Sequence, residues 1–280
     1  MATATSWRTR DSILDLTSGI LMGVVNVTPD SFSDGGRYSN PAAAVSHGLG
    51  LVSEGAELVD VGGESTRPGA PAVPVEEELA RVLPVVEGLV EQGVRVSIDT
   101  SKLEVARAAL AAGAEVVNDV RALRAPGLAE LAAETGCGVV VVHMRGEPSD
   151  MQRDPRYDDV VGEVESFLLR RAASLEEKGV DPGRIAIDPG IGFGKTLEHN
   201  LALLAALGRF ASHGYPVVLG TSRKTFLGAL TGIAEASERD LPTAVTTALG
   251  FVAGARVFRV HDIPSSRCAL AVASAIVRSQ

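Results

Sequence analysis

The sequence predicts a (β/α)8 barrel, the TIM-barrel class of α/β fold, formed by a single domain. Short apolar segments recur eight times along the 280 residues, and each ends in a cluster of polar or glycine residues. Each cluster is followed by a helix-like stretch rich in alanine, leucine and charged residues. A closed barrel of this class needs eight such units in about 250 residues, and the loops after its strands build the active site. The polar clusters therefore mark the expected reactive face.

The eight apolar segments are rich in Val, Ile and Leu, as parallel strands buried on both faces should be. The expected strands cover residues 20–27, 57–61, 95–99, 115–119, 138–143, 184–188, 216–221 and 256–260. The expected helices cover residues 41–54, 75–92, 102–112, 126–135, 158–178, 197–208, 224–230 with 238–253, and 264–278.

Helix-start signals agree with these ranges. Pro41 and Pro264 stand where a first helical turn begins, a position that tolerates proline. Ser101 and Glu104 have the spacing of a capping box. We therefore expect Ser101 to be a helix cap rather than a catalytic group.

Residues 1–12 are rich in Ser, Thr and Arg and lack periodicity, which predicts a flexible tail before a barrel domain at 13–280. No linker interrupts the repeating pattern. There is no secretory signal and no apolar run near the roughly 20 residues of a membrane span. We expect a soluble cytoplasmic protein without a membrane partner.

Charge and cysteine content exclude several classes of protein. The net charge of -9 argues against a nucleic-acid partner, which would need a basic surface. Cys137 and Cys268 are far apart in apolar surroundings, so we expect two buried thiols rather than a disulfide or a metal site. Cations nevertheless gather in the strand-end clusters, which favours an anionic small substrate: Arg67, Arg145, Arg223, Lys224, Arg259 and His261.

Four polar residues at the ends of different strands are expected to point into one cavity: Asp99, Asn118, Asp188 and Lys224. Such groups suit a planar heterocycle with donor and acceptor edges. Arg259 and His261, two apart on the last strand, should face the same way and form a phosphate pocket. For any single aspartate, a helix cap or a salt bridge is the alternative. A Schiff-base role for Lys224 is disfavoured, because surrounding aspartates favour a charged ammonium.

The segments 22–36 (MGVVNVTPDSFSDGG) and 60–69 (DVGGESTRPG) resemble the two signature segments of the dihydropteroate synthase family. The resemblance continues in the family's order through residues 97–100, 117–119, 188–195, 222–224 and 259–262. It implies a transferase of folate biosynthesis. The reaction condenses 6-hydroxymethyl-7,8-dihydropterin pyrophosphate with para-aminobenzoate, giving 7,8-dihydropteroate and pyrophosphate.

The resemblance also implies roles for individual residues. Pterin binding falls to Asp99, Asn118, Asp188, Lys224 and Arg259. Pyrophosphate binding falls to Thr66, Arg67, Arg259 and His261, together with Mg2+ held by Asn26. Para-aminobenzoate would lie by Phe32, Pro68, Phe193, Ser222 and Lys224, where sulfonamides compete. The implied catalytic group is Arg67, Lys224, Arg259, His261 and Asp30.

A dissociative substitution at the pterin methylene fits these residues. Magnesium and arginines can neutralise the leaving pyrophosphate, while loops at residues 30–34 and 66–69 close to exclude water. The resemblance further implies a homodimer, with Pro242–Gly254 and Pro264–Val277 as the candidate helices. A methyltetrahydrofolate-dependent methyltransferase and a non-catalytic pterin-binding paralogue are the alternative functions. His143 and Arg145 receive no role.

Overall fold

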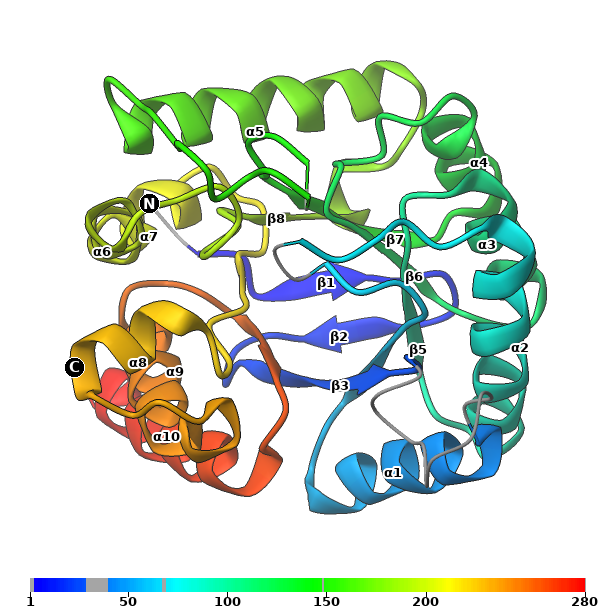
Figure 1. Ribbon diagram of the computed structural model, residues 1–280, viewed down its shortest axis with the longest axis horizontal. Coiled ribbons are helices and arrows are strands. Elements are labelled where there is room, and N and C mark those ends of the chain that lie inside the picture. The colour runs from blue at the N-terminus through cyan, green and yellow to red at the C-terminus, as the bar shows by residue number, and fades with distance from the viewer. Residues whose placement is uncertain (1–2, 29–39, 67–68, 148, 280) are drawn as a thin grey trace.

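Eight parallel strands form a closed barrel surrounded by helices (Figure 1). The computed structural model describes residues 3–28, 40–66, 69–147 and 149–279. The strand order is β8-β7-β6-β5-β4-β3-β10-β9. A bridge between Ile187 and Val217, with a 2.9 Å hydrogen bond from the Ile187 N–H to the Pro216 carbonyl, joins β8 to the β9 segment. The predicted (β/α)8 fold is confirmed.

Every predicted strand and helix has a counterpart. The barrel strands are β3 (Ile20–Asn26), β4 (Leu58–Gly62), β5 (Val96–Asp99), β6 (Val116–Asp119), β7 (Gly138–Val142), β8 (Ile185–Asp188), β9 (Val218–Leu219) and β10 (Val257–Val260). The helices are α1 (Pro41–Glu54), α2 (Val75–Glu91), α3 (Leu103–Ala111), α4 (Leu128–Thr135), α5 (Val160–Glu177), α6 (Leu197–Ala205), α7 (Leu207–Ala211), α8 (Thr225–Thr231), α9 (Asp240–Val252) and α10 (Ile263–Arg278). Two 3-10 turns, η1 (Pro182–Arg184) and η2 (Ala236–Glu238), complete the order.

Local sequence signals account for several helix starts. Pro41 and Pro264 do lie in the first turns of α1 and α10. The prediction for Ser101 is wrong, because α3 starts at Leu103 with Lys102 in the cap position. The Ser101 hydroxyl instead donates to the carboxylate of Asp119. A buried carboxylate outside the helix therefore takes the hydroxyl that the capping-box pattern assigned to the helix.

The amino-terminal segment forms a hairpin in place of the predicted flexible tail. Strand β1 (Ser6–Arg8) pairs antiparallel with β2 (Ile13–Asp15). The Trp7 side chain is completely buried, and its Nε1–H donates to the Arg184 carbonyl over 2.9 Å. The prediction of a flexible tail is therefore wrong for Ser6–Arg8. Two strands of three residues are too short to give a recognisable period-two pattern, and the burial of Trp7 is a tertiary effect.

Two apolar layers position the site. The inner layer fills the barrel with the inward side chains of the strands and with Trp7: Ile20, Met22, Leu58, Val116, Val140, Ala186, Val218 and Val257. The larger outer layer packs the strands against the helices. Since the interior and the amino-terminal end of the barrel are filled, open space is left at the carboxyl ends of the strands.

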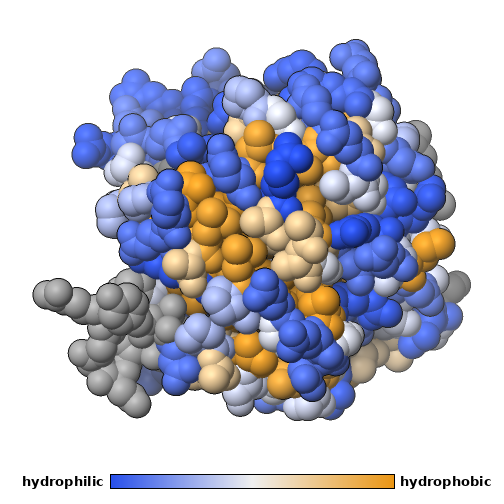
Figure 2. All heavy atoms as spheres, turned by 90° about the vertical axis from the view of Figure 1, so that its right-hand side faces the viewer, coloured by the Kyte–Doolittle hydropathy of each residue, from blue (hydrophilic) through white to orange (hydrophobic). Residues whose placement is uncertain are grey.

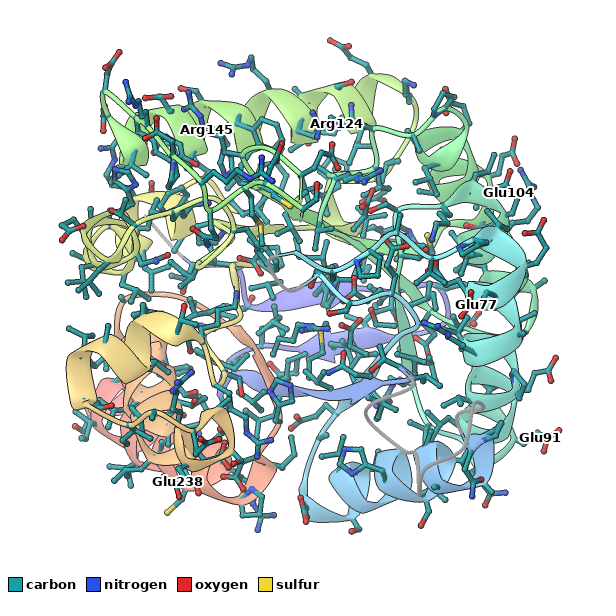
Figure 3. The ribbon with its side chains drawn as sticks, viewed as in Figure 1. Glu77, Glu91, Glu104, Arg124, Arg145 and Glu238 are labelled. Atoms are coloured by element: carbon teal, nitrogen blue, oxygen red, sulfur yellow. The ribbon has the colours of Figure 1, made fainter. Side chains whose placement is uncertain are left out.

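The outer helices carry charged residues at the surface of this acidic protein. The side chains of Glu91 on α2 and Glu104 on α3 point away from the barrel (Figure 3). On that side of the molecule, hydrophilic residues surround the hydrophobic residues that show between them (Figure 2). Cys137 is buried as predicted, but Cys268 is exposed, so the prediction for Cys268 is wrong. In the ranges that the structure describes, no helix has the length and apolar character that a membrane span requires.

Trp7→Ala should lower the free energy of unfolding by about 3–5 kcal/mol, because it removes a large buried side chain and leaves a cavity. Urea unfolding followed by circular dichroism measures the change. Ile13→Ala is the matched control in the same hairpin, since Ile13 is 70% exposed. A loss below about 1 kcal/mol for Trp7→Ala would mean that the hairpin does not seal the barrel.

Candidate active site

A small cavity of about 40 Å³ lies at the carboxyl ends of the barrel strands. All four strand-end residues predicted to share a cavity line it, namely Asp99, Asn118, Asp188 and Lys224. Its other lining residues are Thr66, Val120, Val142, Phe193, Gly220, Ser222, Arg259 and His261. Four further candidates, Asp30, Phe32, Arg67 and Pro68, lie outside the described residues.

The register of the barrel explains why these side chains converge. Asp99 on β5 is the register partner of Asn118 on β6, so the two stand side by side. Asp188 ends β8 and is followed by a tight turn at Gly190, whose φ is 66°. A Cβ at Gly190 would lie 1.8 Å from the carbonyl oxygen of His143. Only glycine therefore lets the loop after β8 pass this close to the end of β7.

Arg259 on β10 is held between two carboxylates. Its Nε donates to Asp60 Oδ2 over 2.6 Å, and its Nη2 donates to Asp99 Oδ2 over 2.8 Å. Burial raises the pKa of Asp99 to about 7, and the positive charge of Arg259 opposes this rise. Asp60 is completely buried and was given no role by the sequence. The sequence signals were a carboxylate inside an otherwise apolar strand and its place at the start of the segment 60–69.

Asp60 also orients the amide of Asn118. The Asn118 Nδ2–H donates to Asp60 Oδ2 over 3.0 Å, so the amide carbonyl faces the other way. Among the described residues, Asn118 Oδ1 has no hydrogen-bond partner. Burial likewise raises the pKa of Asp188, whose Oδ1 accepts from the Gly190 N–H over 2.7 Å. The cavity thus gathers oxygen acceptors suited to a ligand edge that carries N–H donors.

Lys224 supplies a cation to the same cavity. Burial lowers the pKa of its ammonium to about 8, against the negative charge of Asp188, which raises it. Its Nζ donates to the Ile191 carbonyl and lies 4.4 Å from the centre of the Phe193 ring. At neutral pH the group is mainly an ammonium, the form that binds anions rather than the form that makes a Schiff base.

Ser222 and His261 connect the last two strands of the barrel. The Ser222 Oγ lies 2.9 Å from His261 Nδ1, and the His261 backbone N–H donates to the same oxygen over 3.1 Å. Arg259 and His261 both line the cavity, as their spacing of two residues on one strand predicts.

Asn26, the predicted metal ligand, ends β3 and is partly exposed. No described residue forms a hydrogen bond with its side chain, so its amide oxygen is available to a hard cation. Within the described ranges, no three His, Cys, Asp or Glu side chains gather into a metal-binding group.

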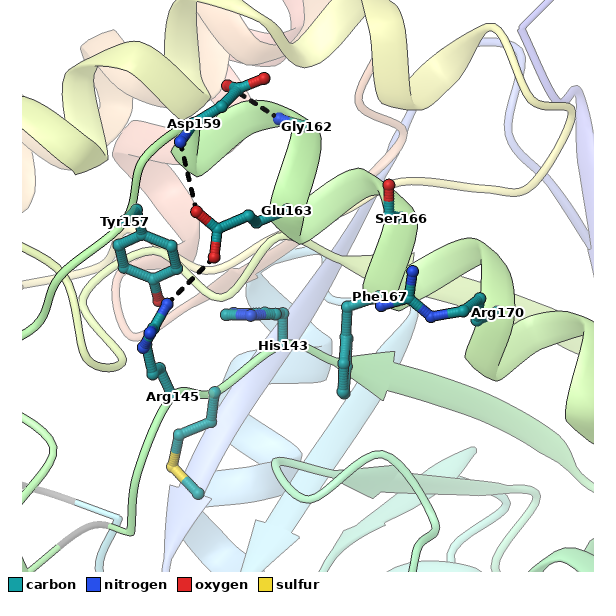
Figure 4. A pocket seen from close by; sticks show the side chains of 10 residues that line it. His143, Arg145, Tyr157, Asp159, Gly162, Glu163, Ser166, Phe167 and Arg170 are labelled. Atoms are coloured by element: carbon teal, nitrogen blue, oxygen red, sulfur yellow. Dashed lines mark hydrogen bonds and ion pairs between the residues drawn. The ribbon is translucent and has the colours of Figure 1, made fainter.

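A larger cavity of about 610 Å³ lies outside the barrel mouth, between the end of β7 and α5 (Figure 4). Its charged groups are largely paired: Arg145 contacts Glu163 over 3.1 Å, and Asp159 accepts from the Gly162 N–H over 3.0 Å. The smaller cavity is the better candidate despite its size. Its polar side chains come from the ends of several barrel strands, whereas the larger cavity is lined by the segment that follows β7 and by α5.

Lys195 holds residues next to the cavity in place, a role that the sequence did not indicate. Its buried Nζ lies 3.0 Å from His143 Nδ1 and donates to the Phe193 carbonyl over 3.0 Å. Burial lowers the pKa of His143 to about 2, so the ring is neutral. His143 and Lys195 are therefore packing groups that fix the loop carrying Phe193.

The chain is similar to proteins of one family over nearly its whole length. The profile of a family described as "Pterin binding enzyme" matches residues 22–261. A dihydropteroate synthase of Escherichia coli K12 is 44% identical over 268 residues, covering 95% of this chain and 95% of the relative. A structure of Xanthomonas albilineans dihydropteroate synthase with 4-aminobenzoic acid has a TM-score of 0.92 and 49% identity, covering 98% and 99% of the two chains. The same enzyme in complex with 7,8-dihydropteroate has a TM-score of 0.88 and 45% identity, covering 97% and 98%.

Asp188→Asn should lower the pKa of Lys224 below about 8, because the substitution removes the negative charge that raises it. NMR titration of isotope-labelled lysine side chains measures this pKa. Glu130→Gln is the control, since Glu130 pairs with the distant Lys178 over 2.8 Å and should leave Lys224 unchanged. An unchanged or higher Lys224 pKa in Asp188→Asn would contradict the electrostatic coupling of the two groups.

Proposed function

The chain belongs to the dihydropteroate synthase family of pterin binding enzymes, and we propose that the barrel-mouth cavity is where it joins its two substrates. As a dihydropteroate synthase, it condenses 6-hydroxymethyl-7,8-dihydropterin pyrophosphate with para-aminobenzoate to give 7,8-dihydropteroate and pyrophosphate. The observation that supports placing the reaction in this cavity is the convergence of Asp99, Asn118, Asp188 and Lys224 on it.

The acceptors bind the pterin in this proposal. Asp188 takes the ring N–H and the amino group, since a carboxylate can accept two parallel N–H bonds. Asn118 and Asp99 complete the pyrimidine side and the N8 region, and Asn118 can do so because its Oδ1 is left without a partner among the described residues. Lys224 meets the pterin carbonyl as an ammonium donor.

The basic side chains hold the leaving pyrophosphate in this proposal, and a magnesium ion would add to their positive charge. Arg259 donates hydrogen bonds to carboxylates from Nε and Nη2. Its Nη1 forms no hydrogen bond with the described residues, so it can donate to pyrophosphate. Thr66 and His261 line the same cavity, and Arg67 joins them by family resemblance. Asn26 would hold Mg2+, an ion that commonly binds one or two protein oxygens and fills its shell with water and phosphate. When bound, Mg2+ supplies positive charge that stabilises the departing pyrophosphate.

Para-aminobenzoate is assigned to the outer part of the cavity. Ser222 and Lys224 offer a hydroxyl and an ammonium for its carboxylate, and Phe193 offers an apolar face for its ring. Phe32 and Pro68 would complete the site by family resemblance. Sulfonamides, which imitate this aromatic acid, are the expected competitors.

We infer a dissociative substitution at the pterin methylene. The C–O bond to pyrophosphate breaks first, and the dihydropterin ring stabilises the cation by conjugation. The aniline nitrogen then attacks, and it loses a proton after the new bond forms. Arg259 and His261 favour departure by binding the growing negative charge before the nucleophile arrives. Asp30 and the loops around it are assigned to excluding water.

The purified protein should release pyrophosphate in repeated turnovers when both the dihydropterin pyrophosphate and para-aminobenzoate are present, which a coupled pyrophosphate assay measures. A non-catalytic paralogue would release none, and a methyltransferase would instead consume a methylated folate.

Asp188→Asn should weaken pterin binding by more than tenfold, or about 1.4 kcal/mol, because buried N–H donors lose a charged acceptor. Asp181→Asn makes the same change at the exposed Arg8 pair and should bind pterin normally.

A homodimer through α9 and α10 is also proposed. Four apolar side chains at helical spacing lie exposed along α9: Leu241, Val245, Leu249 and Val252. Val272 and Ile276 are exposed one turn apart on α10. An apolar stripe of this kind on two adjoining helices marks an interaction surface, and the family resemblance names a second copy of the chain as its partner. The location in the cytoplasm stays a prediction.

Leu249→Glu should convert the dimer to a monomer, because it places a charge in the middle of the apolar stripe. Sedimentation velocity at micromolar protein concentration measures the change. Leu230→Glu on α8 is the control, since Leu230 is 51% exposed and lies outside the stripe. A Leu249→Glu protein that sediments like the wild type would rule out this surface.

A further inference from the structure

Arg223 has an unusual backbone conformation between two residues of the active site. Its φ is 60°, in the left-handed region that residues with a side chain rarely occupy. The neighbours on either side, Ser222 and Lys224, both line the cavity. Such a conformation persists only when surrounding contacts fix it, and it often marks a functional site.

Three groups fix Arg223, and all of them come from the start of α9. The guanidinium makes a two-pronged ion pair with Asp240, with Nε to Oδ1 at 2.7 Å and Nη2 to Oδ2 at 2.8 Å. The Arg223 backbone N–H donates to Thr243 Oγ1 over 3.2 Å. Its carbonyl accepts from Arg239 Nη1 over 3.1 Å. Both backbone groups and the side chain are thereby tied to one rigid element.

Arg239 is itself anchored, so the contacts form a continuous support. It is buried, and its guanidinium also donates to the carbonyls of Ile233 and Ala234 in the loop before η2. On the cavity side, the Ser222 Oγ contacts His261, and Lys224 contacts the Ile191 carbonyl. A change of φ at Arg223 would redirect the chain between Ser222 and Lys224 and break these contacts.

We propose that Arg223 and Asp240 are positioning residues, which hold Ser222 and Lys224 in the orientation that binds para-aminobenzoate. This inference rests on the proposed function. Lys224 serves both substrates, whereas Ser222 serves only the second, and the pterin acceptors Asp99, Asn118 and Asp188 come from other strands. Loss of the Arg223–Asp240 ion pair therefore acts more strongly on para-aminobenzoate than on pterin. A residue needed only for stability would affect both substrates alike.

Three variants test the role of the Arg223–Asp240 ion pair in the steady-state pyrophosphate assay. Asp240→Asn and Arg223→Ala should raise the KM for para-aminobenzoate about tenfold and change pterin affinity, measured by calorimetry, less than threefold. Arg223→Gly should have a smaller effect on KM than Arg223→Ala, because glycine adopts a φ of 60° without the steric cost. Arg209→Ala, which removes an exterior ion pair with Glu165, is the control and should behave as the wild type.

The proposal is overturned if Asp240→Asn leaves the KM for para-aminobenzoate unchanged, or if it lowers affinity for both substrates equally. It is also overturned if Arg223→Gly and Arg223→Ala are equally impaired. Thermal unfolding of each variant identifies a protein that fails to fold, and Arg223→Lys, which keeps the charge but loses the two-pronged contact, then provides the second measurement. If Arg223→Lys raises the KM for para-aminobenzoate alone, the proposal is supported. If its KM is normal, the proposal is overturned. A wild-type protein that releases no pyrophosphate would refute the proposed function instead.

Discussion

A buried guanidinium held between two carboxylates organises the mouth of this barrel. Arg259 joins β10 to β4 through Asp60 and to β5 through Asp99. Bringing three charges into a protein interior costs several kcal/mol per ion, and removing one partner would leave an uncompensated charge. The same Asp60 turns the amide of Asn118. One ion network therefore fixes the shape of the cavity and the direction in which its hydrogen-bonding groups face.

The fold and much of the cavity follow from the sequence because the barrel imposes strong constraints. A strand buried on both faces must be apolar along its length, so each strand is visible as a run that ends abruptly at a polar group. Closure then brings all the carboxyl ends to one rim. This is why Asp99, Asn118, Asp188 and Lys224 could be predicted to share a cavity, although their individual roles stay predictions.

Other features depend on contacts that a local pattern does not contain. The hairpin that buries Trp7 is fixed by the starts of distant strands. Cys268 is exposed because it lies on α10 outside the stripe of buried residues that includes Ser266 and Leu270. Lys195 is buried against His143, 52 residues away. The left-handed backbone of Arg223 depends on Asp240, 17 residues later. For Trp7, Lys195 and Arg223 the partner is distant in sequence, and no periodicity encodes it.

The amino-terminal hairpin also determines how molecules reach and leave the cavity. Since Trp7 and the inner layer fill the opposite end, a ligand in the described cavity has the mouth as its route to solvent. Substrates and products then enter and leave through the same opening. In a cavity closed at its far end, a ligand that lies deeper has to bind before one that lies nearer the rim. The amino-terminal hairpin, although remote from the chemistry, thereby constrains the order in which two substrates can bind.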